Sequence, residues 1–382
     1  MKSEEFNLFV LLRNYPVGLA VTKKIDNLLT YLYKNNIKIK VLSYRSKFKQ
    51  PYYNADQYPI PFDSIGYNLK LLCLHKAVAY FVKGLRVIQK GKKHGFNNIF
   101  YCIGPLNIEN FLFVFWAKLL HYKIVFDINE DYSFFEDKVK ITSRFKIITT
   151  KRLDVLTYKW ADAITVVSTY LRNKYLNLTD KPVLLVPVTA VENFRTDKNV
   201  DQELLKIVYA GTFDRKDGVD AIIEGFLMFS RNYKKANLIL MGKSELQKEY
   251  QNRFGNYENI SFKGYVPDNQ FYEVLREADI LCMCRTNSDF ANAGFPFKLG
   301  EYLATGNPVI STRASDVCDY LTSDDAFLVD FDSPEEIAAA FQKIAGNQDE
   351  ARRIGLNGFR KYQRYFSPES NGKILLEGLL RV

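Results

Sequence analysis

The chain has 382 residues, 47% hydrophobic and 25% charged, which excludes disordered and fibrous proteins and is typical of a globular one. A chain of this length is too long for a single hydrophobic core and suits two domains of about 150–200 residues each. Residues 1–190 hold 29 Lys and Arg against 14 Asp and Glu, a charge of +15 within an overall +10, so we expect an anionic partner for this half: a membrane surface, a lipid diphosphate or nucleic acid.

Along the whole chain, apolar runs alternate with segments in which apolar residues recur at helical spacing. The first half contains predicted strands at 6–12, 37–43, 98–102, 124–127, 163–167 and 183–186. The second half contains predicted strands at 206–210, 237–241, 260–262, 280–284, 308–311 and 326–329. Strands rich in Val, Ile and Leu that alternate with helices predict an α/β fold with parallel sheets covered on both faces.

The polar segment 189–204 separates the two series of strands and is predicted to be an interdomain linker. We expect a first domain at 1–188 and a second at 189–366, with a C-terminal helix at 367–382 that packs back on the first. Both domains are predicted to be doubly wound and Rossmann-like. Ligands bind at the carboxyl ends of such strands, so the predicted active site is a cleft between the domains.

Targeting and cysteine signals are weak. Residues 1–5 include two glutamates and no apolar core, so we do not expect a signal peptide, and the apolar block 111–117 is too short to span a bilayer. The five cysteines show no metal-ligand spacing, and Cys282 and Cys284, which alternate within an apolar run, are predicted to be buried free thiols. An odd number of cysteines without a disulfide framework favours a reducing compartment. We expect a cytoplasmic protein.

The most informative segment, 294–309, is predicted to be a loop, a short helix, a glycine C-cap and a buried strand. Pro296 lies in the first turn, where free backbone N–H groups attract phosphate. Lys298 adds a positive charge, and Glu301 lies three residues on, able to face the same ligand. The pattern describes a nucleotide-sugar site. An ordinary amphipathic helix with a solvated Lys–Glu pair fits the spacing equally well.

Two further basic loops follow predicted strands of the second half. After the strand at 206–210, Gly211 permits close approach, and Arg215 and Lys216 precede a helix that begins near 217–218. Arg285 closes the strand at 280–284. A charged turn in which Asp214 and Asp217 neutralise their neighbours is the alternative. Three basic loops at one sheet edge favour bound phosphate.

The first half offers weaker signals. Gly18 follows the first strand and precedes a helix that Thr22 is able to start, although a surface turn is equally compatible. Glu130 and Asp131 follow the strand at 124–127, where a carboxylate can orient an acceptor hydroxyl or stabilise positive charge on a sugar ring. Capping of the next segment by these acidic residues is the alternative.

The motifs at 209–219, Arg285 and 294–309, in this order, resemble the retaining glycosyltransferases of the GT-B fold. They are most similar to the superfamily called glycosyl transferases group 1, which assembles bacterial capsule, exopolysaccharide and lipopolysaccharide. The resemblance covers the second half and is looser in the first. It implies a hexosyltransferase with a UDP- or GDP-linked sugar as donor, a glycan or polyprenyl-diphosphate-linked acceptor, and no obligatory metal or other cofactor.

The resemblance also implies roles for individual residues. Lys216, Arg215 and Lys298 neutralise the donor diphosphate with the amides of Gly294 and Phe295, while Glu301 binds the ribose. The catalytic candidates are Glu130, Asp131 and Lys216. The donor-binding candidates are Gly18, Gly211, Thr212, Arg215, Lys216, Arg285, Gly294, Phe295, Pro296, Lys298, Leu299 and Glu301.

The sequence departs from the family pattern at two places. The first glutamate of the family's paired motif is Ala293 here, and no histidine follows the strand at 124–127. These departures leave two alternatives open: a nucleotide-binding partner without turnover, and a nucleotide-sugar epimerase on the same fold. The donor base, the sugar, the acceptor and the oligomeric state do not follow from the sequence.

A predicted amphipathic helix at 65–95 mixes leucine, aromatic residues and lysine, and a second basic cluster contains Arg144, Lys146, Lys151 and Arg152. We hypothesise that both lie against an anionic membrane, on the inner face of the plasma membrane, and guide a lipid-linked acceptor. Packed helices with solvated lysines are the alternative. No recognised nucleic-acid-binding module accompanies the charge, so we expect no nucleic-acid partner.

Overall fold

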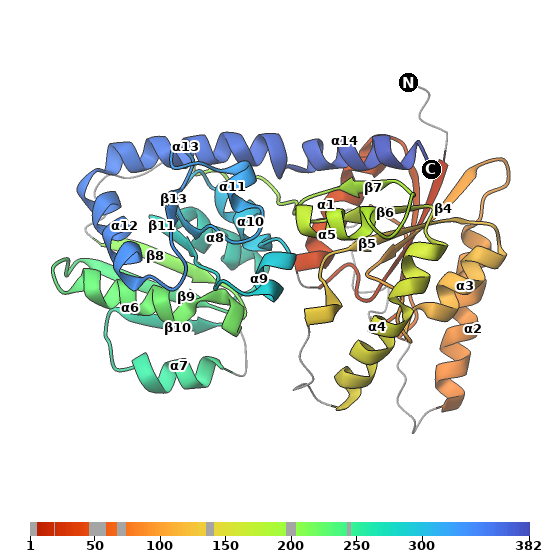
Figure 1. The fold of residues 1–382 in the computed structure, drawn as a ribbon, viewed down its shortest axis with the longest axis horizontal. Coiled ribbons are helices and arrows are strands. Elements are labelled where there is room, and N and C mark those ends of the chain that lie inside the picture. The colour runs from red at the N-terminus through yellow and green to blue at the C-terminus, as the bar shows by residue number, and fades with distance from the viewer. Residues whose placement is uncertain are drawn as a thin grey trace. The chain divides into compact units, whose positions relative to one another are not determined.

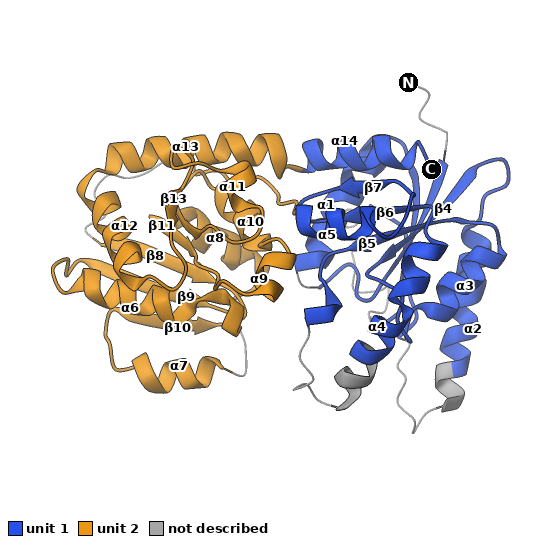
Figure 2. Cartoon of the chain, in the orientation of Figure 1, with its two compact units in different colours: residues 1–187, 368–382 blue, residues 188–367 orange. Residues whose placement is uncertain are grey.

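The structure, a computed structural model, describes residues 6–18, 20–45, 59–66, 74–134, 141–195, 204–242 and 246–382. The chain divides into two compact units, the first formed by residues 1–187 and 368–382 and the second by residues 188–367 (Figure 2). Each unit contains a parallel sheet with helices on both faces (Figure 1). The predicted α/β architecture of two Rossmann-like units is confirmed.

In its described part, the first unit has a seven-stranded sheet in the order β3-β2-β1-β4-β5-β6-β7. The strands are β1 Phe6–Leu12, β2 Lys38–Ser43, β3 Phe62–Ser64, β4 Asn97–Ile103, β5 Lys123–Ile128, β6 Ala163–Val166 and β7 Val183–Leu185. The helices are α1 Ala20–Lys34, α2 Leu74–Gly91, α3 Phe111–Leu119, α4 Ile141–Trp160, α5 Thr169–Leu176 and α14 Pro368–Leu379, with a 3-10 turn, η3, at Tyr132–Phe134.

The described part of the second unit has a six-stranded sheet in the order β10-β9-β8-β11-β12-β13. The strands are β8 Leu205–Ala210, β9 Ala236–Met241, β10 Ile260–Gly264, β11 Ile280–Met283, β12 Val309–Thr312 and β13 Phe327–Val329. The helices are α6 Val219–Ser230, α7 Gln247–Phe254, α8 Asp268–Glu277, α9 Asp289–Ala293, α10 Phe297–Leu303, α11 Val317–Tyr320, α12 Pro334–Gly346 and α13 Gln348–Tyr365, with a 3-10 turn, η4, at Arg215–Asp217.

All twelve predicted strands are present, and β3 is the strand that the sequence pattern missed. It has three residues and lies at the edge of its sheet, where a short strand needs no long apolar run. Helix α1 begins at Ala20, ahead of the predicted start at Thr22. Of the predicted helix at 65–95, residues 74–91 are helical, residues 65–66 are not, and residues 67–73 lie outside the described part.

The predicted linker is wrong for residues 189–195, which are built into the second unit. The amide of Ala190 donates to the carbonyl of Phe366 at 3.0 Å, and the amide of Arg195 donates to that of Thr305, also at 3.0 Å. Polar composition suggested a linker, but an extended segment satisfies its backbone groups on neighbouring loops just as well. Residues 196–203 lie outside the described part.

Helix α14 packs against α1 and β7 of the first unit. Gly372 and Gly378 allow this approach, because a Cβ at either position would lie 2.3 Å from the ring of Tyr31 or 2.1 Å from the side chain of Leu184. No helix in the described part of the chain is long and apolar enough to cross a membrane.

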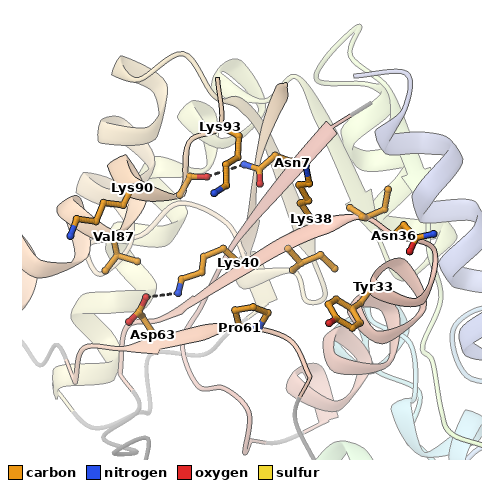
Figure 3. A pocket seen from close by; sticks show the side chains of 13 residues that line it. Asn7, Tyr33, Asn36, Lys38, Lys40, Pro61, Asp63, Val87, Lys90 and Lys93 are labelled. Atoms are coloured by element: carbon orange, nitrogen blue, oxygen red, sulfur yellow. Dashed lines mark hydrogen bonds and ion pairs between the residues drawn. The ribbon is translucent and has the colours of Figure 1, made fainter. Parts of the chain in front are cut away.

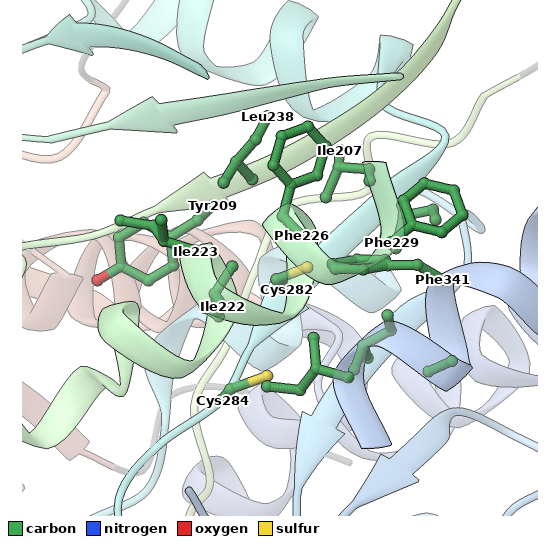
Figure 4. Close-up of a cluster of buried hydrophobic side chains, with 14 of the residues drawn as sticks. Ile207, Tyr209, Ile222, Ile223, Phe226, Phe229, Leu238, Cys282, Cys284 and Phe341 are labelled. Atoms are coloured by element: carbon green, nitrogen blue, oxygen red, sulfur yellow. The ribbon is translucent and has the colours of Figure 1, made fainter. Parts of the chain in front are cut away.

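The core of the second unit fills the space between its sheet and α6 and α12. Figure 4 shows Ile207 and Leu238 on the strands, Phe226 and Phe229 on α6, and Phe341 on α12 around one apolar centre. Burying each such side chain stabilises the fold by about 1.5–3 kcal/mol. This core holds the carboxyl ends of β8 and β11 side by side, which positions the loops described below.

A buried ion pair lies at the carboxyl end of β5 in the first unit. The Nζ of Lys24 on α1 is 3.1 Å from an oxygen of Asp127, and neither side chain is exposed. The same carboxylate accepts hydrogen bonds from Tyr101 at 3.0 Å and Thr165 at 2.7 Å, and Asn129 donates to its other oxygen at 2.6 Å. Asp127 therefore joins α1, β4, β5 and β6.

Replacing Lys24 by alanine leaves the carboxylate of Asp127 buried without a counter-charge. We expect the free energy of unfolding to fall by about 3–5 kcal/mol. Urea denaturation measures this loss. Lys34→Ala, which removes an exposed charge from the last turn of the same helix, is the matched control and should change stability by less than about 0.5 kcal/mol. Similar losses in both variants would contradict this prediction.

Candidate functional site

The carboxyl edge of the second sheet brings the predicted basic loops together. Gly211 follows β8, and a Cβ at this position would lie 2.4 Å from the hydroxyl of Tyr209 and 2.7 Å from the Nζ of Lys298. Only glycine therefore lets the Lys298 side chain from α10 reach the end of β8. The sequence predicted close approach at Gly211, and the group that approaches is a lysine of the same unit.

Lys298 forms an ion pair with Asp217, the last residue of η4. Its Nζ lies 2.6 Å from an oxygen of Asp217, whose side chain is 2% exposed against 17% for Lys298. The other carboxylate oxygen accepts from the hydroxyl of Thr212 at 3.1 Å and from the amide of Asp214 at 3.3 Å. The side chain of Asp214 in turn caps the N-terminus of η4, so Asp214 and Asp217 form a capping box. This capping box fixes the carboxylate that pairs with Lys298.

The surrounding charges keep Asp217 ionised. Burial by itself raises the pKa of this carboxyl, but the charge and hydrogen bond of Lys298, followed by the charges of Arg285 and Lys216, lower it to about 2. All three cations therefore lower the pKa of the same carboxyl group.

The loop after β8 is joined directly to the loop after β11. The amide of Thr286 donates to the carbonyl of Lys216 at 3.1 Å, and the Nζ of Lys216 lies 4.2 Å from the ring centre of Phe290. Gly218 has φ = 58°, and a Cβ there would lie 1.8 Å from the carbonyl oxygen of Cys284. Glycine is therefore required for contact between the two loops.

Arg285 and Arg215 differ in their setting. The Arg285 side chain is buried, and its Nη1 donates to the carbonyl of Ala291 at 2.8 Å, so this guanidinium also shapes the loop before α10. Arg215 is exposed, and so is Thr212 apart from its bond to Asp217. Arg215 thus lies at the rim of the site, whereas Lys298 lies inside it.

The segment 294–301 keeps several of its side chains in the core. Phe295 is buried, with its ring centre 5.6 Å from those of Phe366 and Tyr320, and Pro296 is buried at the N-cap of α10. Leu299 is fully buried, and its amide already donates to the carbonyl of Pro296 at 3.1 Å. The backbone of this segment, including Gly294, is therefore the part that can meet a ligand. Lys298 and Glu301 are half-buried and lie one turn apart.

In the first unit, the predicted Asp131 is already engaged. Its oxygens accept from the Nζ of Lys174 at 2.9 and 3.0 Å, from the hydroxyl of Ser133 at 2.7 Å and from Tyr170 at 3.2 Å. Burial raises the pKa of this carboxyl, but the bonds from Ser133 and Lys174 outweigh it and lower the pKa. Asp131 is thus fixed as an anion, and the half-buried Glu130 lines a cavity of about 190 Å³ beside it.

Gly18, the other candidate in the first unit, is packed against α1. A Cβ there would lie 2.1 Å from the hydroxyl oxygen of Thr22, whose hydroxyl donates to the carbonyl of Asn14 at 3.2 Å. The structure therefore places Gly18 where the chain turns tightly into α1. It places Gly18, Glu130 and Asp131 in the unit that does not contain Lys216, Lys298 and Glu301.

Asp217 is the main site residue that sequence reasoning missed, because it was considered only as a charge that neutralises its neighbours. The signal was present: Asp214 and Asp217 have the spacing of a capping box just before a helix. Tyr209, whose hydroxyl lies 3.5 Å from the Nζ of Lys298, was also missed. It was hidden within the apolar pattern of β8.

Asp217 should make stability depend on acid pH. Its pKa in the folded protein is about 2 against 3.8 for an unperturbed carboxyl, so it stabilises the fold above pH 3.8 and loses this effect as pH falls toward 2. We expect the stability difference between wild type and Asp217→Asn to be about 1 kcal/mol smaller at pH 3 than at pH 7.

Urea unfolding of both proteins at the two pH values measures this change. Asp319→Asn, at an exposed carboxylate in the same unit, is the matched control variant. A pH-independent difference for Asp217→Asn would contradict the assignment.

Residues 190–361 match the family described as Glycosyl transferases group 1. No curated protein matches the chain in sequence. Similar solved structures include HepE from Anabaena in complex with UDP and glucose, 13% identical with a TM-score of 0.72, where the alignment covers 99% of this chain and 100% of that one.

Sucrose-phosphate synthase from Thermosynechococcus elongatus is 16% identical with a TM-score of 0.71 over 99% of this chain and 98% of that one. A mutant of S. aureus TarM, solved with fondaparinux, alpha-GlcNAc-glycerol and UDP, is 10% identical with a TM-score of 0.71 over 98% and 99%. At such identities the likeness establishes the fold. Together with the family match of residues 190–361, it shows a chain of the GT-B fold whose second unit carries a glycosyl transferases group 1 domain.

Proposed function

We propose that this glycosyltransferase moves a hexose from a nucleotide diphosphate sugar to a lipid-linked or growing glycan acceptor, with retention of anomeric configuration, in bacterial surface polysaccharide synthesis. The observation that carries the proposal is the position of Lys298, which pairs with Asp217 at the carboxyl edge of the second sheet, beside the loop of Lys216 that is hydrogen-bonded to the loop following Arg285. Residues 189–366 form the donor domain in this proposal. Residues 1–188 and the helix at 367–382 form the acceptor domain.

The charge of this cluster suits a diphosphate diester. Arg215, Lys216, Arg285 and Lys298 supply four positive charges, and Asp214 and Asp217 remove two, which leaves about +2 against a donor diphosphate of about −2. During transfer, the bond between the anomeric carbon and the diphosphate oxygen breaks and negative charge develops on the leaving group. A cation that meets this charge in a closed site contributes on the order of 3 kcal/mol to the transition state.

The remaining donor contacts are proposed to come from α10 and from the loop that precedes it. Glu301, one turn beyond Lys298, accepts hydrogen bonds from the ribose hydroxyls in this proposal. The backbone at Gly294 and Phe295 contacts the sugar and phosphates, because the Phe295 ring is held in the core. The donor is UDP- or GDP-linked. HepE of Anabaena, which shares the fold, is solved with UDP-glucose, which supports a uridine nucleotide.

The acceptor side is proposed to use Glu130 and Asp131. Glu130 lines a cavity where it can accept the proton of an acceptor hydroxyl or face positive charge on the sugar ring. Asp131 is held by Lys174 and Ser133, so we assign it the role of positioning the loop that carries Glu130.

Surface composition supports a peripheral position on an anionic membrane. Helix α2 exposes Val78, Tyr80 and Val82 next to Lys83 and Arg86, a mixture typical of interfacial helices. Lys151 and Arg152 are exposed on α4; the side chains of Arg144 and Lys146 lie outside the described part. A lipid-linked acceptor would be reached from such a surface.

Ala293 favours a second function, a nucleotide-binding partner without turnover. It occupies the place of the family's first motif glutamate, and its side chain is 1% exposed, so it offers a ligand no polar group. Nucleotide release from the donor separates the two functions: an enzyme releases UDP or GDP faster when acceptor is added, whereas a partner protein binds the nucleotide without release.

Calorimetric titration with UDP and GDP should show one nucleotide bound per chain. The basic cluster at the edge of the second sheet is the physical reason. Binding of neither nucleotide by the folded protein would contradict the proposed donor site. Binding without acceptor-stimulated release would select the partner function.

Removing one cation of the cluster should reduce transfer without unfolding the protein. For Lys298→Gln and for Lys216→Gln we expect kcat/KM for the donor to fall on the order of 10²-fold, because each removes charge that stabilises the leaving diphosphate. Lys263→Gln, at an exposed lysine on β10, is the matched control and should keep its rate. Thermal unfolding checks each variant, and equal rates in all three would exclude this role for the cluster.

A further inference from the structure

A cavity in the first unit belongs to neither candidate site. Its volume is about 740 Å³, within the range of small-molecule sites (Figure 3). Asn7 and Lys38, at the beginnings of β1 and β2, line it, so it opens at the amino edge of the sheet. Gly18, Glu130 and Asp131 follow the carboxyl ends of strands, at the opposite edge.

Positive charge dominates the lining. The charged residues are Lys38, Lys40, Lys90, Lys93 and a single acidic residue, Asp63. The Nζ of Lys40 lies 2.7 Å from a carboxylate oxygen of Asp63, which neutralises both (Figure 3). Three positive charges remain, because Lys38, Lys90 and Lys93 form no ion pair with any described residue; the Nζ of Lys38 lies 4.2 Å from the ring centre of Phe96. Lysines that share a cavity without counter-charges repel one another, and a bound anion relieves this repulsion.

The wall that carries these lysines is held by buried asparagines. Asn98 accepts from the amide of Lys93 at 2.8 Å and donates to its carbonyl at 2.8 Å. Asn7 donates to the carbonyl of Gly91 at 3.0 Å and to the side-chain oxygen of Asn98 at 2.9 Å. The last carbonyl of α2 is thereby satisfied within the protein. The backbone of Lys93 is fixed beside the cavity.

A simpler explanation exists for Lys90, because a lysine in the last turn of α2 stabilises the negative end of the helix dipole. This explanation does not apply to Lys38, which begins a strand, or to Lys93, which follows the helix. It also does not account for the apolar part of the lining, which includes Tyr33, Ile37, Ile39 and Val87.

We propose that this cavity binds a phosphorylated compound of at least two negative charges. Lys38, Lys90 and Lys93 contact its phosphate groups, and its apolar or ring portion lies against Tyr33 and Val87. The phosphate has two possible sources, a soluble phosphate ester or a phospholipid headgroup. In either case the site is separate from the donor site and does not depend on the proposed function.

Calorimetric titration of the full chain with inorganic pyrophosphate tests the site. Lys90→Gln/Lys93→Gln removes two lining charges, and Lys118→Gln/Lys181→Gln removes two exposed charges of the first unit outside the lining. We expect the first variant to weaken one component of pyrophosphate binding at least tenfold and the second to leave it within twofold. Lys216→Gln/Lys298→Gln should leave this component intact, because it affects only the donor site.

Flotation with vesicles of phosphatidylglycerol or phosphatidylcholine distinguishes the two sources. Binding to the anionic vesicles that is lost in the lining variant alone identifies a lipid headgroup, whereas selective loss of pyrophosphate binding alone identifies a soluble ester. The proposal is overturned if neither ligand binds, or if the lining and control variants lose binding equally, since equal loss reflects net charge only. If the unaltered protein shows this component but binds neither UDP nor GDP, the donor site is contradicted instead.

Discussion

The ion pair between Asp217 and Lys298 is the contact on which the candidate donor site depends. It connects η4, which follows β8, with α10, which follows the loop after β11. Without it, Lys298 would be a long side chain free to sample many rotamers. The bidentate use of Asp217, with one oxygen on Lys298 and the other on Thr212 and the amide of Asp214, fixes the direction from which the lysine approaches β8.

Burying this ion pair costs free energy, and the role of Lys298 in the candidate site explains why the cost is tolerated. Taking a carboxylate and an ammonium out of water costs several kcal/mol per ion, and mutual attraction offsets this only with good geometry and further hydrogen bonds. Asp217 has both. The result is a lysine whose charge is placed in advance, so little ordering remains to be done when an anion arrives. Gly211 and Gly218 also help to position this lysine. A larger residue at position 211 would displace Lys298, and one at position 218 would separate the two loops.

The fold could be predicted from the sequence because parallel strands buried on both faces are nearly continuous apolar runs, and these are visible in one dimension. The basic residues of the site could also be predicted, because they follow strand ends. Asp217 could not be ranked above its neighbours, because its importance comes from Lys298, 81 residues later, and spacing does not show which carboxylate a lysine contacts. The cavity at the amino edge was missed for the same reason: Lys38 and Lys93 belong to separate elements that only the sheet brings together.

The ion pair of Lys24 and Asp127 shows by contrast why the pair of Lys298 and Asp217 suits an anion-binding site. Lys24 and Asp127 also lie at a carboxyl edge, but both are fully enclosed and share hydrogen bonds with Tyr101, Thr165 and Asn129. Such a pair can only hold strands and α1 together. Lys298 keeps 17% of its side chain exposed while its partner is almost fully buried. One end of this pair is therefore anchored and the other is accessible, which is the arrangement that an anion-binding lysine requires.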